Sequence, residues 1–276
     1  MEGAFVGFFD ERFNIALFLT LLAGLSTALG AAVALFVRER RTGLLAFGLG
    51  FSAGVMLYVS FVEILPGARH AFEALTTSKE AEMAALLAFF GGMALTFAID
   101  WAVPDEINPH ELKNSNQIDS ALAISSSSLK KTGIVTALAL ALHNFPEGFA
   151  TFVASMQSSQ LGIMIALAVA IHNIPEGMAV ALPLYYATGE RRRAFYYAML
   201  SGLAEPVGAL AGYFLLYPLL GPLTLGVVFG GVAGVMVYVS LDELMPAART
   251  FGYAHLSIIG VMAGMGVMAL SLLLLN

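Results

Sequence analysis

The stretch LALALHNFPEGFATF, residues 138–152, decides the fold, because it places His143, Asn144 and Glu147 inside a run that is otherwise apolar enough to cross a bilayer. The stretch AVAIHNIPEGMAV, residues 168–180, repeats the same polar residues at the same spacing, again with a proline and a glycine. A charged side chain near the centre of a membrane helix costs at least about 2.5–3.5 kcal/mol. Two copies of this motif therefore indicate a site whose function requires buried polar groups.

The composition is that of a membrane protein. Of the 276 residues, 59% are hydrophobic and 12% are charged, whereas an average soluble domain has roughly 25% charged residues. Cysteine is absent, which excludes disulfide bonds and thiolate metal sites. The net charge of −6 offers no basic surface to a nucleic acid, and the sequence has no GxxxxGK[ST] loop for nucleotide phosphates. We therefore expect the lipid bilayer as a partner, no nucleic acid and no bound cofactor.

The hydrophobic segments predict the helices. An α-helix needs about 20 apolar residues to cross the roughly 30 Å hydrocarbon core. Eight such segments predict an all-α, polytopic membrane protein with a single transmembrane domain over residues 1–276. The predicted helices are 15–37, 43–65, 83–103, 131–155, 161–183, 193–217, 222–245 and 255–275. The loop of about residues 102–130 is too polar to bury a core, and we expect it to be flexible.

Lysine and arginine side chains predict the orientation, because short cytoplasmic loops carry an excess of them. Ten of the 13 basic residues fall in alternate loops, and only Arg12, Arg69 and Lys79 fall in the others. We therefore expect both termini outside the cytoplasm and the 102–130 loop inside it. The ten residues are Arg38, Arg40, Arg41, Lys113, Lys130, Lys131, Arg191, Arg192, Arg193 and Arg249.

A second repeat relates the second and seventh predicted helices. AGVMLYVSFVEILPGAR, residues 53–69, aligns without gaps on AGVMVYVSLDELMPAAR, residues 233–249, with 11 of 17 positions identical. The predicted topology runs these two helices in opposite directions, as it does the two helices with the HNxPEG motifs. The sequence therefore predicts an inverted repeat, with three helices on each side of a central pair. Such repeats are typical of secondary transporters, whose binding site lies near the midplane.

The paired motifs predict a metal site. Positions i, i+1 and i+4 share one face of an α-helix, and a connection of about five residues makes the two helices antiparallel neighbours with opposed polar faces. The cores of these spans contain no lysine or arginine that could neutralise Glu147 and Glu176. Imidazole, carboxylate and amide groups together favour a divalent transition metal. The predicted ligands are His143, Asn144, Glu147, His172, Asn173 and Glu176.

Prolines and a third carboxylate extend this prediction. Pro146 and Pro175 free the carbonyls four residues earlier, and such carbonyls are tolerated at membrane depth where they line a cavity. The sixth predicted helix carries SGLAEPVG, in which Glu205 is the only acid and is followed by Pro206. A third carboxylate at this depth predicts a second metal in the same site.

Other residues allow alternative interpretations. A single buried histidine is more often a hydrogen-bonded core residue than a ligand, and asparagines also suit packing contacts between membrane helices. The repeat places Glu63 at the outer mouth and Asp242 and Glu243 at the inner mouth, as vestibule groups. Met56 suits core packing or a soft metal, and His110 suits a solvated loop or the capture of an exiting metal. A glycine ridge in the seventh helix predicts close packing and, as an alternative, a homodimer face; it consists of Gly226, Gly230 and Gly234.

The motifs HNFPEG, HNIPEG, SGLAEP and VSLDELMPAA follow one another on the fourth to seventh predicted helices and resemble those of the ZIP (Zrt-, Irt-like) family of metal transporters. The resemblance implies eight helices with both termini outside, an inverted repeat and a binuclear metal site. It implies one metal held by His143, Glu147, His172 and Glu176, and a second that shares the glutamates with Asn144, Asn173 and Glu205. It also implies uptake of divalent metals by an elevator-like movement of one helix bundle against another.

We therefore expect a multi-pass secondary transporter of a bacterial inner membrane that carries zinc into the cytoplasm, with iron, manganese, cobalt and cadmium as further cargo. An intramembrane metal-dependent hydrolase is one alternative, although the HExxH pair of such enzymes is absent. A metal sensor without flux is another, although residues 102–130 are too short and polar to form an output domain. The transporter interpretation means that the chain is not expected to be an enzyme.

Overall fold

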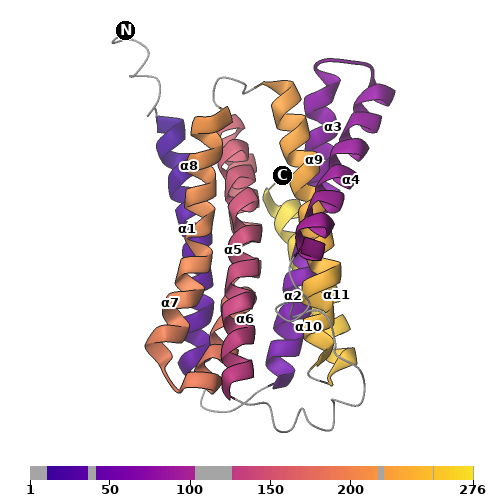
Figure 1. The fold of residues 1–276 in the computed structure, drawn as a ribbon. Helices are drawn as coiled ribbons and strands as arrows, with labels where there is room; N and C mark the ends of the chain where they lie inside the picture. The colour runs from indigo at the N-terminus through magenta and orange to yellow at the C-terminus, as the bar shows by residue number, and fades with distance from the viewer. Residues whose placement is uncertain (1–10, 37–41, 103–125, 217–220, 251, 276) are drawn as a thin grey trace.

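The computed structural model describes residues 11–36, 42–102, 126–216, 221–250 and 252–275. Within these ranges every regular element is helical and no strand occurs, so the all-α prediction is confirmed there. Figure 1 shows the helices side by side in one elongated bundle, in which successive long helices run in opposite directions.

The helices follow the predicted segments, with differences at their ends. Their bounds are α1 Glu11–Phe36, α2 Thr42–Val59, α3 Leu65–Glu73, α4 Ser78–Ala102, α5 Ser126–Gln157, α6 Ser159–Thr188, α7 Arg191–Gly202, α8 Ala204–Leu216, α9 Pro222–Val239, α10 Met245–Thr250 and α11 Ala254–Leu275.

Two long helices each contain a π-helical turn. α2 continues into α3 through the π-helical turn Ser60–Ile64, and α9 continues into α10 through the π-helical turn Ser240–Leu244. The two turns occupy equivalent places in the aligned stretches 53–69 and 233–249. Because a π-helical turn changes the hydrogen-bond register of a helix, it redirects the side chains around it, and such turns are frequent at functional sites.

The second helix extends beyond its predicted end at residue 65. α3 carries it on to Glu73, because Ala68, Ala71 and Phe72 form a buried face there. This face packs against α4 and α9. The sequence prediction ended the helix too early because the exposed charges around this face break the apolar run.

The segment predicted as one helix over 193–217 is broken. α7 ends at Gly202 and α8 begins at Ala204, with Leu203 in a turn between them. Pro206 explains the break, because it has no N–H to donate to the Gly202 carbonyl and its ring would collide with that carbonyl in a regular helix. The break places Glu205 in the first turn of α8.

Seven helical segments of the described residues are long and apolar enough to cross a membrane. They are 11–36, 46–73, 78–101, 159–182, 191–215, 222–249 and 254–274. α5, the predicted fourth span, is not among them, although its 32 residues exceed the length required. Its polar motif and its serine- and lysine-containing start lower its hydropathy.

The helices form two groups. α1, α5, α6, α7 and α8 pack against one another, and α2, α3, α4, α9, α10 and α11 form the second group. Figure 1 shows the first group on the left and the second on the right. α2 packs on α6 and α5 packs on α9 where the groups meet. The two HNxPEG motifs therefore lie in one group, and the two π-helical turns lie in the other.

The glycine ridge of the seventh predicted helix packs inside the chain. A Cβ at Gly226 would meet the ring of Phe72, and one at Gly230 would meet Ala88. A Cβ at Gly234 would collide with the carbonyl of Phe89. The close-packing interpretation of this ridge is confirmed, and the same contacts remove it as a homodimer face.

Candidate metal centre

α5 and α6 form a tight antiparallel pair. Only Ser158 separates them, rather than the predicted five residues or so, and it has the extended backbone of a helix N-cap (φ −151°, ψ 127°). Its side chain accepts a hydrogen bond from the backbone N–H of Leu161 at 3.4 Å. The short connection holds the two motif-bearing helices side by side along their lengths (Figure 1).

The polar side chains of both motifs point into the protein. Six of the seven predicted principal ligands are at most 2% exposed: Asn144, Glu147, His172, Asn173, Glu176 and Glu205. The side chain of the seventh, His143, lies outside the described residues, although its backbone belongs to α5. The structure thus brings residues from α5, α6 and α8 to one buried region.

His172 connects the two motif copies. Its Nδ1–H donates a hydrogen bond to the carbonyl of Ala168 at 3.0 Å. Its Nε2 lies 3.0 Å from Oε1 of Glu147 on α5. Because Nδ1 is occupied by a carbonyl, Nε2 is the ring atom that remains for a metal, which is the usual arrangement of a metal-binding histidine. Ser52 of α2 donates to the backbone carbonyl of His172 at 3.2 Å and so ties the second helix group to the motif.

The two motif asparagines make equivalent contacts. Asn144 Nδ2 donates to the carbonyl of Ser201 on α7 at 3.2 Å, and Asn173 Nδ2 donates to the carbonyl of Ala23 on α1 at 3.0 Å. Asn173 also donates to Oε1 of Glu205 in a short hydrogen bond. Each asparagine therefore uses its amide nitrogen for the protein and leaves its carbonyl oxygen, Oδ1, without a hydrogen-bond partner among the described residues.

Several buried carboxylate oxygens also have no hydrogen-bond partner in the described ranges, namely both oxygens of Glu176 and Oε2 of Glu205. The charges of Glu147 and Glu176 act on Glu205, so the three carboxylates lie close enough to repel one another. A buried carboxylate without a counter-charge is costly. Unpaired oxygens beside an imidazole nitrogen have the chemistry that a divalent cation would satisfy.

The described histidine and acidic side chains do not surround a single point at which a metal ion could bind. Among the described side chains, no three histidine or acidic groups are arranged closely enough to hold one metal ion. His143, the ligand that the motif predicts next to Asn144, is not part of that set because its side chain is not described. Within the described side chains, the site therefore contains two separate contacts, one between His172 and Glu147 and one between Asn173 and Glu205.

The motif glycines let other backbones approach the site. A Cβ at Gly148 of α5 would collide with the carbonyl of Glu205 on α8. A Cβ at Gly177 of α6 would collide with the carbonyl of Thr27 on α1. Glycine at these two positions thus fixes α8 and α1 against the motif helices.

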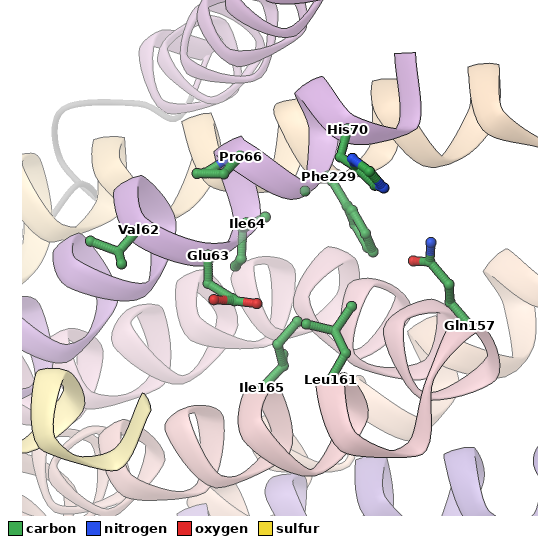
Figure 2. Close-up of a pocket in the computed structure, with 10 residues that line it drawn as sticks. Val62, Glu63, Ile64, Pro66, His70, Gln157, Leu161, Ile165 and Phe229 are labelled. Atoms are coloured by element: carbon green, nitrogen blue, oxygen red, sulfur yellow. The ribbon is translucent and has the colours of Figure 1, made fainter. Parts of the chain in front are cut away.

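A pocket of about 310 Å³ lies between the two helix groups near the α3–α4 end, and Glu63 lines it (Figure 2). In Figure 2 the Glu63 carboxylate points toward Ile165 of α6, and His70 lies beside Phe229. Gln157, the last residue of α5, also lines the pocket. The sequence singled out Glu63 here, but it left His70 unassigned and missed Gln157, because only the fold brings α5 next to α3.

Acidic residues also lie toward the opposite end. Asp242 and Glu243 belong to the π-helical turn of the α9–α10 helix, and both are half-buried. The charges of Glu176 and Asp100 act on Glu243. The Asp100 carboxylate accepts a hydrogen bond from the hydroxyl of Tyr238 at 3.4 Å. Asp100 of α4 and Asp242 and Glu243 of the π-helical turn therefore form an acidic patch, which approaches the motifs at Glu176.

The remaining predicted residues do not join the site. Met56 is fully buried in the main hydrophobic core, as is Met236, which favours the packing interpretation. His110 lies outside the described residues. Sequence reasoning also missed Ser52, Ser201 and Thr27, whose relation to the motifs arises only from helix packing.

Comparisons with known proteins agree on one family. A family profile described as "ZIP Zinc transporter" matches residues 103–272. "Zinc transporter ZupT" of Chlorobium luteolum is 55% identical over 266 residues, which cover 96% of this chain and 100% of that protein. "Zinc transporter ZupT" of Campylobacter jejuni is 50% identical over 285 residues, covering 96% of this chain and 98% of the relative. A ZupT of Corynebacterium glutamicum is 54% identical over 256 residues and covers 93% and 97% of the two chains.

Proposed function

Because the chain belongs to the ZIP family of zinc transporters, we propose that it carries zinc into the cytoplasm through the buried site between α5, α6 and α8. The observation that carries this proposal is Glu176, which is fully buried while both of its oxygens have no hydrogen-bond partner in the described ranges. A passing divalent cation supplies the missing counter-charge. Iron, manganese, cobalt and cadmium suit the same ligand chemistry as further cargo.

The chain is a transporter and not an enzyme, since its family consists of transporters. The hydrolase alternative is thereby removed. We propose that the chain transports metal rather than senses it, because the relatives are named as transporters and align with it over nearly their whole lengths.

We propose a binuclear arrangement of the ligands. One cation is held by His143, Glu147, His172 and Glu176, and a second shares the two glutamates with Asn144, Asn173 and Glu205. The 3.0 Å contact between His172 and Glu147 supports the first set. The hydrogen bond between Asn173 and Glu205 and the mutual repulsion of the carboxylates support the second.

We further propose eight spans in an inverted repeat, with α5 as the eighth span and both termini outside the cytoplasm. The equivalent π-helical turns at 60–64 and 240–244 support the repeat. In Figure 1, α1 begins and α11 ends toward the upper part of the bundle, while α7 begins at its lower end. α7 begins with Arg191, Arg192 and Arg193, so the positive-inside rule assigns the lower end to the cytoplasm of a bacterial inner membrane.

The two helix groups suit an elevator-like movement. All seven principal ligands lie on the group formed by α1 and α5 to α8, whereas Glu63, Asp242 and Glu243 lie on the other group. We propose that the ligand-bearing group carries the cation from the Glu63 pocket toward the acidic patch of Asp100, Asp242 and Glu243. Glu63 then serves as an outer vestibule group, and Asp242 and Glu243 serve as inner ones.

A transport assay tests this proposal. Purified full-length protein in liposomes that contain a zinc-sensitive dye is expected to admit zinc faster than protein-free liposomes do. A panel of the other metals would then rank the cargo, and an imposed pH gradient would identify proton coupling. Zinc entering at the protein-free rate, with correctly inserted protein, would reject the proposal.

A further inference from the structure

Packing contacts identify the counterpart of Glu205 on α1. A Cβ at Gly148 would collide with the carbonyl of Glu205, and a Cβ at the equivalent motif position, Gly177, would collide with the carbonyl of Thr27. A Cβ at Gly208, three residues after Glu205, would collide with the carbonyl of Phe145. Three residues after Thr27, Gly30 has the same relation to the carbonyl of Ile174, which aligns with Phe145 in the motifs.

The asparagine hydrogen bonds give the same correspondence. Asn144 donates to Ser201, which is four residues before Glu205. Asn173 donates to Ala23, which is four residues before Thr27. Thr27 therefore occupies, relative to α6, the position that Glu205 occupies relative to α5. Where one half of the site has a carboxylate, the other half has a neutral hydroxyl.

The Thr27 hydroxyl makes no hydrogen bond within the described part of the protein. Thr27 is fully buried, and its Oγ1 has no hydrogen-bond partner among the described residues. A threonine in a helix normally donates to the carbonyl four residues earlier, as Thr20 does to Ala16 at 2.9 Å. For Thr27 that carbonyl is Ala23, which already accepts from two other side chains, Ser26 Oγ at 2.6 Å and Asn173 Nδ2 at 3.0 Å. These two donors occupy the space around the carbonyl oxygen, and Thr27 Oγ1 makes no bond to it.

The segment that Thr27 contacts contains further oxygens without a hydrogen-bond partner among the described residues. A Cβ built on Gly202 would be 2.9 Å from Thr27 Oγ1, so the hydroxyl lies against the last turn of α7. Ser201, the neighbour of Gly202, has a buried hydroxyl that lacks a hydrogen-bond partner among the described residues. Asn144 donates a hydrogen bond from Nδ2 to the backbone carbonyl of Ser201, and its Oδ1 also lacks a partner there. These neutral oxygens thus belong to residues of α1, α5 and α7 that meet at the break after Gly202.

We propose that the hydroxyls of Thr27 and Ser201 form a neutral half-site that holds a water ligand of the transported divalent cation, opposite the anionic half-site of Asn173 and Glu205. This proposal rests on the proposed function of the site. Hydroxyl oxygens suit such a water, because they accept its hydrogen bonds without adding charge to a site that already contains three carboxylates. Thr27 thereby sets how tightly the site holds a partly hydrated cation.

Two substitutions of Thr27 test this role. Thr27→Val keeps the shape and removes the hydroxyl, whereas Thr27→Ser keeps the hydroxyl. The loss of one hydrogen bond to the bound water is expected to weaken zinc binding by about two- to tenfold in the valine variant, and the serine variant should bind as the wild type does. Zinc affinity would be measured on the purified full-length protein by competition with a fluorescent zinc chelator.

Thermal unfolding of the chelator-treated protein separates this role from a structural one. Thr27→Val should unfold at the wild-type temperature or above it, because it removes a buried hydroxyl that has no partner. Thr20→Val is the matched control on the same helix: its hydroxyl is hydrogen-bonded, so it should unfold at a lower temperature and keep the wild-type zinc affinity.

The outcomes are distinguishable. Unchanged zinc affinity in Thr27→Val, or a fall in its metal-free unfolding temperature as large as that of Thr20→Val, would overturn the half-site. A wild-type protein that binds no zinc would instead overturn the proposed function, and the role of Thr27 with it.

Discussion

His172 and Glu147 meet across the interface of α5 and α6, with Nε2 of the imidazole 3.0 Å from Oε1 of the carboxylate. The two residues come from different copies of the HNxPEG motif, and both are at most 2% exposed. The contact joins the copies at a depth that solvent does not reach. A change to either residue should therefore act on the site as a whole.

His172→Ala is expected to reduce zinc uptake to near background. The substitution removes the only described imidazole of the site and with it the nitrogen, Nε2, that lies 3.0 Å from Glu147 and would bind the cation. Uptake of radioactive zinc by cells with equal amounts of protein in the membrane measures the effect. His255→Ala, at the exposed start of α11, is the control. Equal uptake by the two variants would contradict the assignment of His172.

Glu176→Gln is expected to raise the stability of the metal-free protein and to weaken its binding of zinc. The neutral side chain removes a buried charge whose oxygens have no hydrogen-bond partner in the described ranges, so the metal-free protein should unfold at a higher temperature. Zinc at 100 times its Kd stabilises a single-site protein by about 2.7 kcal/mol, and the variant should lose this gain. Thermal unfolding with zinc and with a chelator measures both effects. Exposed Glu82→Gln is the control, and a zinc-dependent gain retained in Glu176→Gln would count against a ligand role.

Gly148→Ala and Gly177→Ala are each expected to destabilise the protein by about 1–3 kcal/mol, the usual cost of overpacking. Each new methyl group would collide with a backbone carbonyl, that of Glu205 or of Thr27, which cannot move aside as a flexible side chain would. Thermal unfolding and the amount of protein in the membrane measure the loss. Gly91→Ala is the matched control, because its Cβ would have no atom within 4 Å. Unfolding temperatures equal to that control would refute the close approach.

Glu63→Gln is expected to raise the KM for zinc uptake several-fold and to leave the maximal rate unchanged. Glu63 lines the pocket of Figure 2, where its carboxylate raises the local concentration of cations by electrostatic attraction. Initial uptake rates over a range of zinc concentrations, at low and high salt, measure the effect. Glu82→Gln again serves as control, because this exposed acid does not line the pocket. A lower maximal rate at unchanged KM would contradict the vestibule role.

The sequence predicted the helices well, because a hydrocarbon core imposes both their length and their apolar composition. The spacing of Asn144 and Glu147, and of Asn173 and Glu176, likewise predicted buried faces on neighbouring helices. The break at Leu203, which Pro206 explains, was not predicted. Whether these residues bind metal stays a prediction.

Other features could not be predicted, because they depend on packing between helices. The π-helical turn at Ser60–Ile64 has the same apolar character as an ordinary helical turn. Thr27 resembles any small polar residue of a membrane helix until Ser26 and Asn173 are seen to occupy its usual acceptor. The place of the exposed His70 beside the Glu63 pocket could not be predicted either, because it requires α3 to continue as far as Glu73.

The break between α7 and α8 bears on the half of the transport cycle in which no cargo is bound. In the elevator-like cycle proposed above, the ligand-bearing helix group returns without cargo, with three buried carboxylates and no cation to neutralise them. Glu205 lies in the first turn of α8, where the helix macrodipole contributes roughly half a positive charge. The positive end of α8 therefore replaces part of the charge of the absent cation, and in the proposed cycle it lowers the energy of the unloaded state.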